Sequence, residues 1–317
     1  MRTLPSPFRL GIQILIVALV FPSGTVISAQ ETKTSPDADK AQHDQEDRPL
    51  PDIPTLMQQV QANLKGAEAA RKDYIYHSVE TLQELDGNGA VKKTTVNQYD
   101  VFWINGVPVR KLVKKNGKDL TPDEQKKESE RIDKDVAKAR ERKDKAEAKG
   151  KETSSRGDEL VTASRILELG TFSNPRRVKL DGRDTIVADY AGNPKAKTQN
   201  RAEEVIRDLV GTVWVDEQDH VLRKTEGHFL TAFKVGAGLV VNIHKDTSFS
   251  YDQKKVNGEV WLPAQFEGKG AFRFLLFAGF NGRVTLQMSD YRKFKATATI
   301  LPGLNKVEDG AKTRDPQ

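Results

Sequence analysis

The sequence predicts an α+β fold in which one large, curved antiparallel β-sheet has helices gathered on one side. Most of the chain after Tyr74 is rich in β-branched and aromatic residues and is interrupted by glycine-containing turns. Helical patterns are few and do not alternate regularly with strands, as they do in parallel α/β folds. The stretch from Gly258 to Lys293 has the densest apolar run after the N-terminal segment, and its pattern indicates antiparallel strands.

The first 29 residues have the features of a secretory signal peptide. Arg2 and Arg9 accompany an apolar core from Leu10 to Phe21, and Ala29 is a small residue at which a signal peptidase would cut. An uncleaved anchor is the alternative, but the core is shorter than the roughly 17–25 residues of a membrane span. We therefore expect an exported protein, periplasmic or secreted.

Composition narrows the classes of site and partner. The chain has no cysteine, which excludes disulfides, thiolate metal sites and thiol nucleophiles. Its formal charge of +6 is modest, and acidic residues are interspersed with the basic ones. After export, the acidic partners to expect are lipid headgroups or other envelope polymers, and nucleic acid does not fit that compartment.

Residues 30–52 are almost entirely polar and predict a disordered tether, because they have too little apolar surface to offset the entropy of ordering. We expect one domain over residues 53–300, with a charged insertion at residues 119–157, followed by a polar tail at residues 301–317. The insertion should start a helix at Thr121, with Pro122 at the first helical position. A solvated helix and a basic binding arm are both consistent with its charges.

The remaining elements follow from periodicity and turn residues. Apolar residues at helical spacing predict a helix from Ile53 to about Arg71, and others predict short helices over residues 160–169 and 202–209. Strands are expected at residues 74–83, 91–104, 107–115, 177–180, 185–190, 212–215, 221–233 and 239–251, on either side of Gly268–Gly270, and at 283–294.

No arrangement of residues points to catalysis. The chain has no G-x-S-x-G nucleophile elbow and no glycine-rich phosphate loop between a strand and a helix. If a hairpin turns near Gly236, His228 and His244 face each other, either as a weak metal site or as a polar cross-strand pair. We expect no enzyme activity, no cofactor and no metal.

Three segments resemble one family of envelope proteins. They are GTVWVDEQDHVLRKTEGHF (residues 211–229), NGEVWLP (257–263) and DYRKFK (290–295). With the order of elements, they resemble the LolA/LolB-like and RseB-like superfamily of periplasmic lipoprotein carriers, most strongly over residues 212–294. The charged insertion departs from the compact carriers of that family.

The resemblance implies a half-open β-barrel with helices on its concave side, and an apolar surface that holds lipid or lipoprotein acyl chains. Large aromatic side chains are the candidates for lining it, and the alternative, favoured for any single residue, is that it simply fills the core. The segment RFLLFAGF (residues 273–280) would present one face to the core and the other either to a covering helix or to a membrane or partner. The candidate lining residues are Trp103, Trp214, Phe229, Phe233, Phe249, Trp261, Phe266, Phe272, Phe274 and Phe277.

The expected function is therefore non-enzymatic binding or carriage of an apolar ligand. The alternative is an envelope interaction or stress-sensing module that acts through the charged insertion, with a membrane surface or an envelope protein as its partner.

Overall fold

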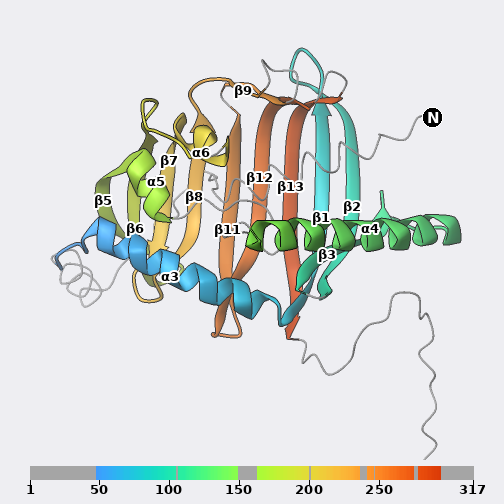
Figure 1. Ribbon diagram of the computed structural model, residues 1–317, viewed down its shortest axis with the longest axis horizontal. Helices are drawn as coiled ribbons and strands as arrows, with labels where there is room; N and C mark the ends of the chain where they lie inside the picture. The colour runs from blue at the N-terminus through green and yellow to red at the C-terminus, as the bar shows by residue number, and fades with distance from the viewer. Residues whose placement is uncertain are drawn as a thin grey trace, which may run out of the picture.

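The computed structural model describes residues 48–104, 106–148, 163–199, 201–235, 241–245, 247–274 and 278–293. Four described helices lie against a 13-stranded sheet in which every pair of neighbouring strands is antiparallel. Figure 1 shows α3 and α4 crossing in front of the strands. The α+β class, with an open curved sheet and helices on one side, is confirmed.

The helices are α3 (Ile53–Arg71), α4 (Pro122–Glu147), α5 (Ala163–Leu169) and α6 (Arg201–Ile206). The strands are β1 (Tyr74–Leu85), β2 (Val91–Ile104), β3 (Val107–Lys115), β4 (Lys118–Asp119), β5 (Gly170–Leu180), β6 (Arg183–Gly192), β7 (Leu209–Asp216), β8 (Val221–Phe229), β9 (Phe233–Val235), β10 (Val241–Ile243), β11 (Ser248–Val256), β12 (Val260–Phe274) and β13 (Ala278–Lys293).

The sheet joins the two ends of the domain at its centre. Its order is β4-β3-β2-β1-β13-β12-β11-β8-β7-β6-β5, and β9 and β10 lie off this path beside the end of β12. The first strand, β1, therefore pairs with the last, β13, over most of its length. This pairing unites two meanders that are far apart in the sequence into one surface.

Helix α3 packs through one face, as its apolar spacing predicts. The Asp52 carboxylate accepts a hydrogen bond from the Thr55 amide at 3.0 Å and so caps the helix N-terminus. Leu56, Met57 and Val60 are buried against the sheet. Farther along, the Asn63 amide donates to the Asp219 carbonyl at 2.9 Å, which fixes the helix over the β7–β8 turn.

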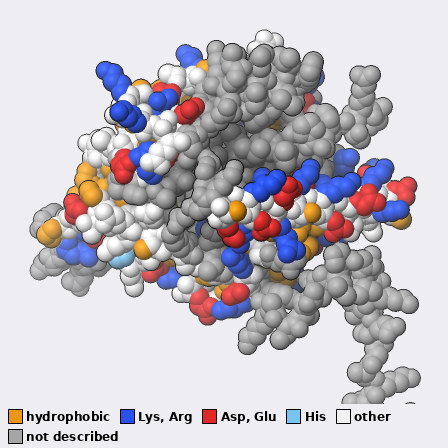
Figure 2. Space-filling model, in the orientation of Figure 1, with side chains coloured by type: hydrophobic (Ala, Val, Ile, Leu, Met, Phe, Trp, Pro, Cys, Tyr) orange, Lys and Arg blue, Asp and Glu red, His pale blue; other side chains and the backbone are white. Residues whose placement is uncertain are grey.

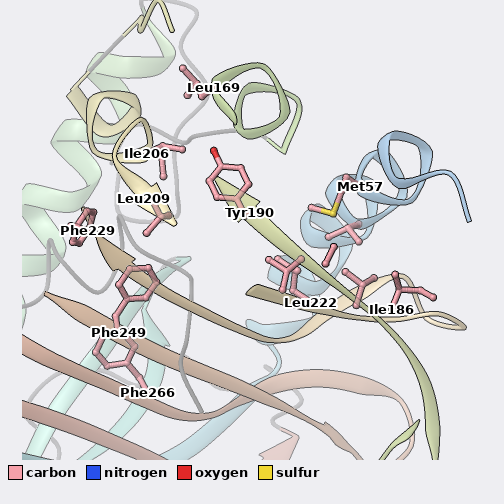
Figure 3. Close-up of a cluster of buried hydrophobic side chains, with 14 of the residues drawn as sticks. Met57, Leu169, Ile186, Tyr190, Ile206, Leu209, Leu222, Phe229, Phe249 and Phe266 are labelled. Carbon is pink, nitrogen blue, oxygen red and sulfur yellow. The ribbon is translucent and has the colours of Figure 1, made fainter. Parts of the chain in front are cut away.

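The main core lies between α3, α5, α6 and the strands from β6 to β13. Figure 3 shows Met57 of α3 in the same cluster as Ile186 and Leu222. Residues 48–52, the end of the predicted tether, also contact the domain, because the Arg48 guanidinium lies 2.7 Å from the Asp184 carboxylate. The predicted signal peptide, the rest of the predicted tether and the predicted tail lie outside the described residues.

Three strand predictions are wrong. The strand predicted over residues 239–251 is broken into β10 and β11, because Thr247 Oγ1 donates to the His244 carbonyl at 2.7 Å and closes a local turn. The predicted break at Gly268–Gly270 does not exist, and β12 runs through it. These glycines serve close packing instead: a Cβ at Gly270 would lie 2.4 Å from Thr247 Oγ1. In addition, the strand predicted to reach Phe233 ends at Phe229.

The fold predicts a packing role for Gly227. A Cβ at this position would lie 2.6 Å from the Phe249 ring and 3.1 Å from Leu209, both in the main core. Gly227→Ala should therefore lower the free energy of unfolding by about 1–3 kcal/mol, as measured by chemical denaturation. The matched control is Gly87→Ala, where a Cβ meets nothing within 4 Å. Equal denaturation midpoints for the two variants would contradict this packing.

Candidate functional site on the concave face

The side of the sheet that carries α3 is the concave face, and side-chain alternation defines it clearly. On β13, Val284 and Leu286 are buried, whereas Arg283 and Gln287 on the other side are exposed. Directly paired residues of neighbouring strands share a face, so the register traces one row across eight strands. The row consists of Asn97, Glu80, Leu286, Phe266, Tyr251, Thr225, Val213 and Ala188.

Three of the candidate aromatic residues lie together on this face. Phe229, Phe249 and Phe266 are all buried in the main core, at most 4% exposed. The Phe229 and Phe249 ring centroids are 6.0 Å apart, and Figure 3 shows Phe249 beside Phe266. The structure thus forms an aromatic cluster from β8, β11 and β12 on the side predicted for ligand binding.

The three tryptophans are not part of that cluster. Trp261 is buried beside the β7–β8 turn, where its indole nitrogen donates to the Asp219 carboxylate at 2.7 Å. Trp214 is half-buried on the opposite face of β7, and Lys224 Nζ lies 4.8 Å from the centre of its ring. Trp103 is half-buried near the end of β2.

The other four candidates are placed only in part. The backbones of Phe272 and Phe274 pair with Phe280 and Ala278, and Phe233 pairs with Ile243. Their side chains, and all of Phe277, lie outside the described residues. The register also corrects the reading of RFLLFAGF as one two-faced strand, because β12 ends at Phe274 and β13 begins at Ala278. Which faces of residues 273–280 are covered therefore depends on side chains outside the described residues.

Sequence reasoning missed a polar cluster on the same face. Glu80 is 6% exposed and accepts hydrogen bonds from the Asn97 amide at 3.2 Å, the Tyr99 hydroxyl at 3.1 Å and the Arg110 guanidinium at 3.1 Å. The guanidinium also lies 4.1 Å from the centre of the Tyr99 ring. The four residues come from three strands, so only the pairing of β1, β2 and β3 reveals the cluster.

The electrostatics of this cluster favour the charged pair. Burial is the largest single effect and disfavours the charged Arg110 guanidinium, but Glu80, Tyr99 and Tyr76 together outweigh it, and the pKa of Arg110 lies above its usual value. The Asn97 amide oxygen is buried and accepts no hydrogen bond from any described residue. The concave face therefore has a fixed charge pair and one unused acceptor beside its apolar part.

A group of tyrosines lies near the C-terminal end of α3. The Tyr76 and Tyr291 rings are 4.8 Å apart between centroids. Burial raises the pKa of the Tyr291 hydroxyl, and it also raises the pKa of Tyr251 although Arg71 acts in the opposite sense. Both phenols thus stay neutral at physiological pH, and they add uncharged amphipathic surface rather than charge.

The expected pairing of His228 with His244 is wrong. His228 is paired with Ser248 between β8 and β11, and the His244 amide donates to the carbonyl of Ala271 in β12. Strands β9 and β10 pair with Phe233 opposite Ile243, and the register of β8 with β11 places Ser248, not His244, opposite His228. Within the described ranges, no group of three or more His, Asp or Glu side chains is arranged to hold a metal ion, and no helix is long and apolar enough to cross a membrane.

Comparisons with known proteins give structural matches only. No family model and no curated protein matches the chain. A putative outer membrane lipoprotein-sorting protein domain from Vibrio parahaemolyticus matches at 12% identity over 76% of this chain and 95% of its own, with a TM-score of 0.34. A DUF1329 family protein from Desulfovibrio piger matches at 8% identity over 78% of this chain and 95% of its own, with a TM-score of 0.29.

A third match is the MucA/MucB complex of Pseudomonas aeruginosa, at 9% identity over 75% of this chain and 99% of the matched chain, with a TM-score of 0.19. The matches include a lipoprotein-sorting domain, the class of protein that the sequence resembles. Since all three TM-scores are below 0.5, the likeness is too distant to carry a functional argument. Function has to be inferred from the residues of this chain.

The polar cluster predicts a large effect for one carboxylate. Glu80→Ala leaves Arg110 buried without its counter-ion, which should lower the free energy of unfolding by about 3 kcal/mol or more. Glu84→Ala on the same strand is the control, since its partner Lys93 is half exposed and such pairs contribute about 0–1 kcal/mol. Urea denaturation of both variants measures the difference. A Glu80→Ala variant as stable as Glu84→Ala would show that the charge pair contributes little.

Proposed function

We propose that this protein is an exported, non-enzymatic carrier or binding protein for a lipid, a lipoprotein acyl chain or a similar apolar ligand, held on the concave face. The signal-peptide features of residues 1–29 support export to the periplasm or beyond. The observation that carries the proposal is the continuous layer of buried apolar and aromatic side chains on one side of an open sheet, from Val213 on β7 to Leu286 on β13, beneath α3, α5 and α6.

The polar cluster at one end of this surface suggests how a ligand would be oriented. Apolar ligand sites are mostly hydrophobic, with a few placed polar groups that fix the direction of the ligand. The buried Asn97 amide oxygen can accept a hydrogen bond from a hydroxyl or amide of an amphiphile. An acyl chain would then lie along the apolar part, toward Leu286 and Phe266.

A second candidate is an envelope interaction or stress-sensing module that acts through the charged insertion. Basic and acidic side chains alternate along the exposed side of α4 in Figure 2. Such a surface suits a charged protein partner and contributes nothing to the binding of an apolar ligand. The two candidates differ in which part of the molecule they require, so ligand uptake and partner binding separate them.

The test is uptake of a fluorescent fatty acid by the delipidated mature protein. Met288 is half-buried on the concave face, two residues from Leu286. Met288→Trp should fill space there and weaken uptake roughly five-fold or more, the equivalent of about 1 kcal/mol. Gln287→Trp is the matched control, since Gln287 is exposed on the opposite face, and it should leave uptake unchanged.

Absence of uptake by the unmodified protein would count against the carrier. Equal loss in both variants would show that the fluorescent probe does not bind on the concave face. Thermal unfolding of each variant serves as the check that the sheet is intact.

A further inference from the structure

Helix α4 occupies the place of a missing strand at the edge of the sheet. Among the residues that the structure describes, β3 is paired on its outer side only by β4, which reaches Lys114 and Lys115. Farther back, the Leu112 amide donates to Glu128 Oε1 at 2.7 Å, and Arg131 Nη2 donates to the Arg110 carbonyl at 2.6 Å. Backbone groups of this kind are normally bonded to a neighbouring strand. Two side chains of α4 thus form hydrogen bonds with backbone groups of β3 at an edge that could otherwise accept a strand.

The contact between α4 and the edge of β3 is small and mostly polar. Glu128 is 5% exposed, and the Arg131 guanidinium bonds both Glu128 and Asp135. Ile132 and Ala139 are the buried hydrophobic residues of the helix within the part of the chain that the structure describes. Beyond Arg131, a groove of about 280 Å³ separates α4 from residues 107–110 of β3. The helix is therefore fastened mainly at one polar latch, formed by Glu128 and Arg131, with incomplete packing beyond it.

The edge is strongly basic. Residues 107–118 contain five lysines and arginines and no acidic residue. Lys111, Lys115 and Lys118 are exposed. The groups of α4 nearest this edge include the carboxylates of Glu128, which bonds β3 directly, and Glu124, which feels the charge of Lys115. The charge of the edge therefore matches an acidic segment, and α4 supplies such carboxylates from within the chain.

We propose that the outer edge of β3 is a docking site for an extended acidic segment of a partner protein, which adds to the sheet as a strand when α4 is displaced. Strand addition to an open edge is a common mode of peptide recognition, in which backbone hydrogen bonds give affinity. Here the lysines of β3 select acidic side chains, and the Glu128–Arg131 latch keeps the edge covered until a partner competes. This site uses the backbone edge of β3 and not the apolar part of the concave face, and it does not require lipid binding.

The test uses two latch variants of the mature chain, Glu128→Ala and Arg131→Ala, and a labelled ten-residue peptide of alternating glutamate and valine. Each variant should exchange the Leu112 amide hydrogen faster than the unmodified protein and should bind the peptide at least ten-fold more tightly. High salt should weaken that binding, because exposed charges are screened. Glu130→Ala and Lys134→Ala, both at exposed positions of α4, should change neither quantity.

A peptide with lysine in place of glutamate is the control for charge and should not bind. The proposal is overturned if the latch variants expose the Leu112 amide yet bind neither peptide, or bind both equally. It is also overturned if Leu112 stays as protected in both latch variants as in the unmodified protein. Fatty-acid uptake, measured on the same samples, reports separately on the concave face.

Discussion

The pairing of β1 with β13 is the constraint on which the rest of the structure depends. These strands come from the two ends of the domain, and their register places Glu80 opposite Leu286. Without this pairing, the meander of β1–β4 and the meander of β5–β13 would each expose an edge and half of a core. With it, one row of side chains runs across eight strands, so the polar cluster and the aromatic core belong to a single concave face.

That face combines two energetic regimes. Its apolar part, with Phe249 and Phe266, is stabilised by burial and by contact with α3. Its polar end, around Glu80, has charged groups whose burial is tolerated only because they are paired. In the proposed carrier, the first part would bind an apolar ligand and the second would orient it. The charged helix α4 lies outside this surface and covers the edge of β3 instead.

Local signals in the sequence predicted elements well. The bounds of α3, β2 and β3 agree with the predicted residues, because apolar spacing and glycine turns are local signals. Gly268 and Gly270 were wrongly interpreted as a break between two strands. Glycine is required at these positions by close packing and not by a turn. The site was predicted less well: Phe229, Phe249 and Phe266 do lie together, but Trp214 faces the other side. The partners of Glu80 depend on strand pairing, which the sequence alone did not give.

Native mass spectrometry of the protein, purified from the envelope of its own host without detergent, shows whether the concave face holds an apolar guest. We expect a bound mass in the range of a lipid or acylated peptide. That mass should be lost after delipidation and should return when lipid extract is added. A chain that shows only its own mass, both as purified and after incubation with lipid extract, would rule out such a carrier.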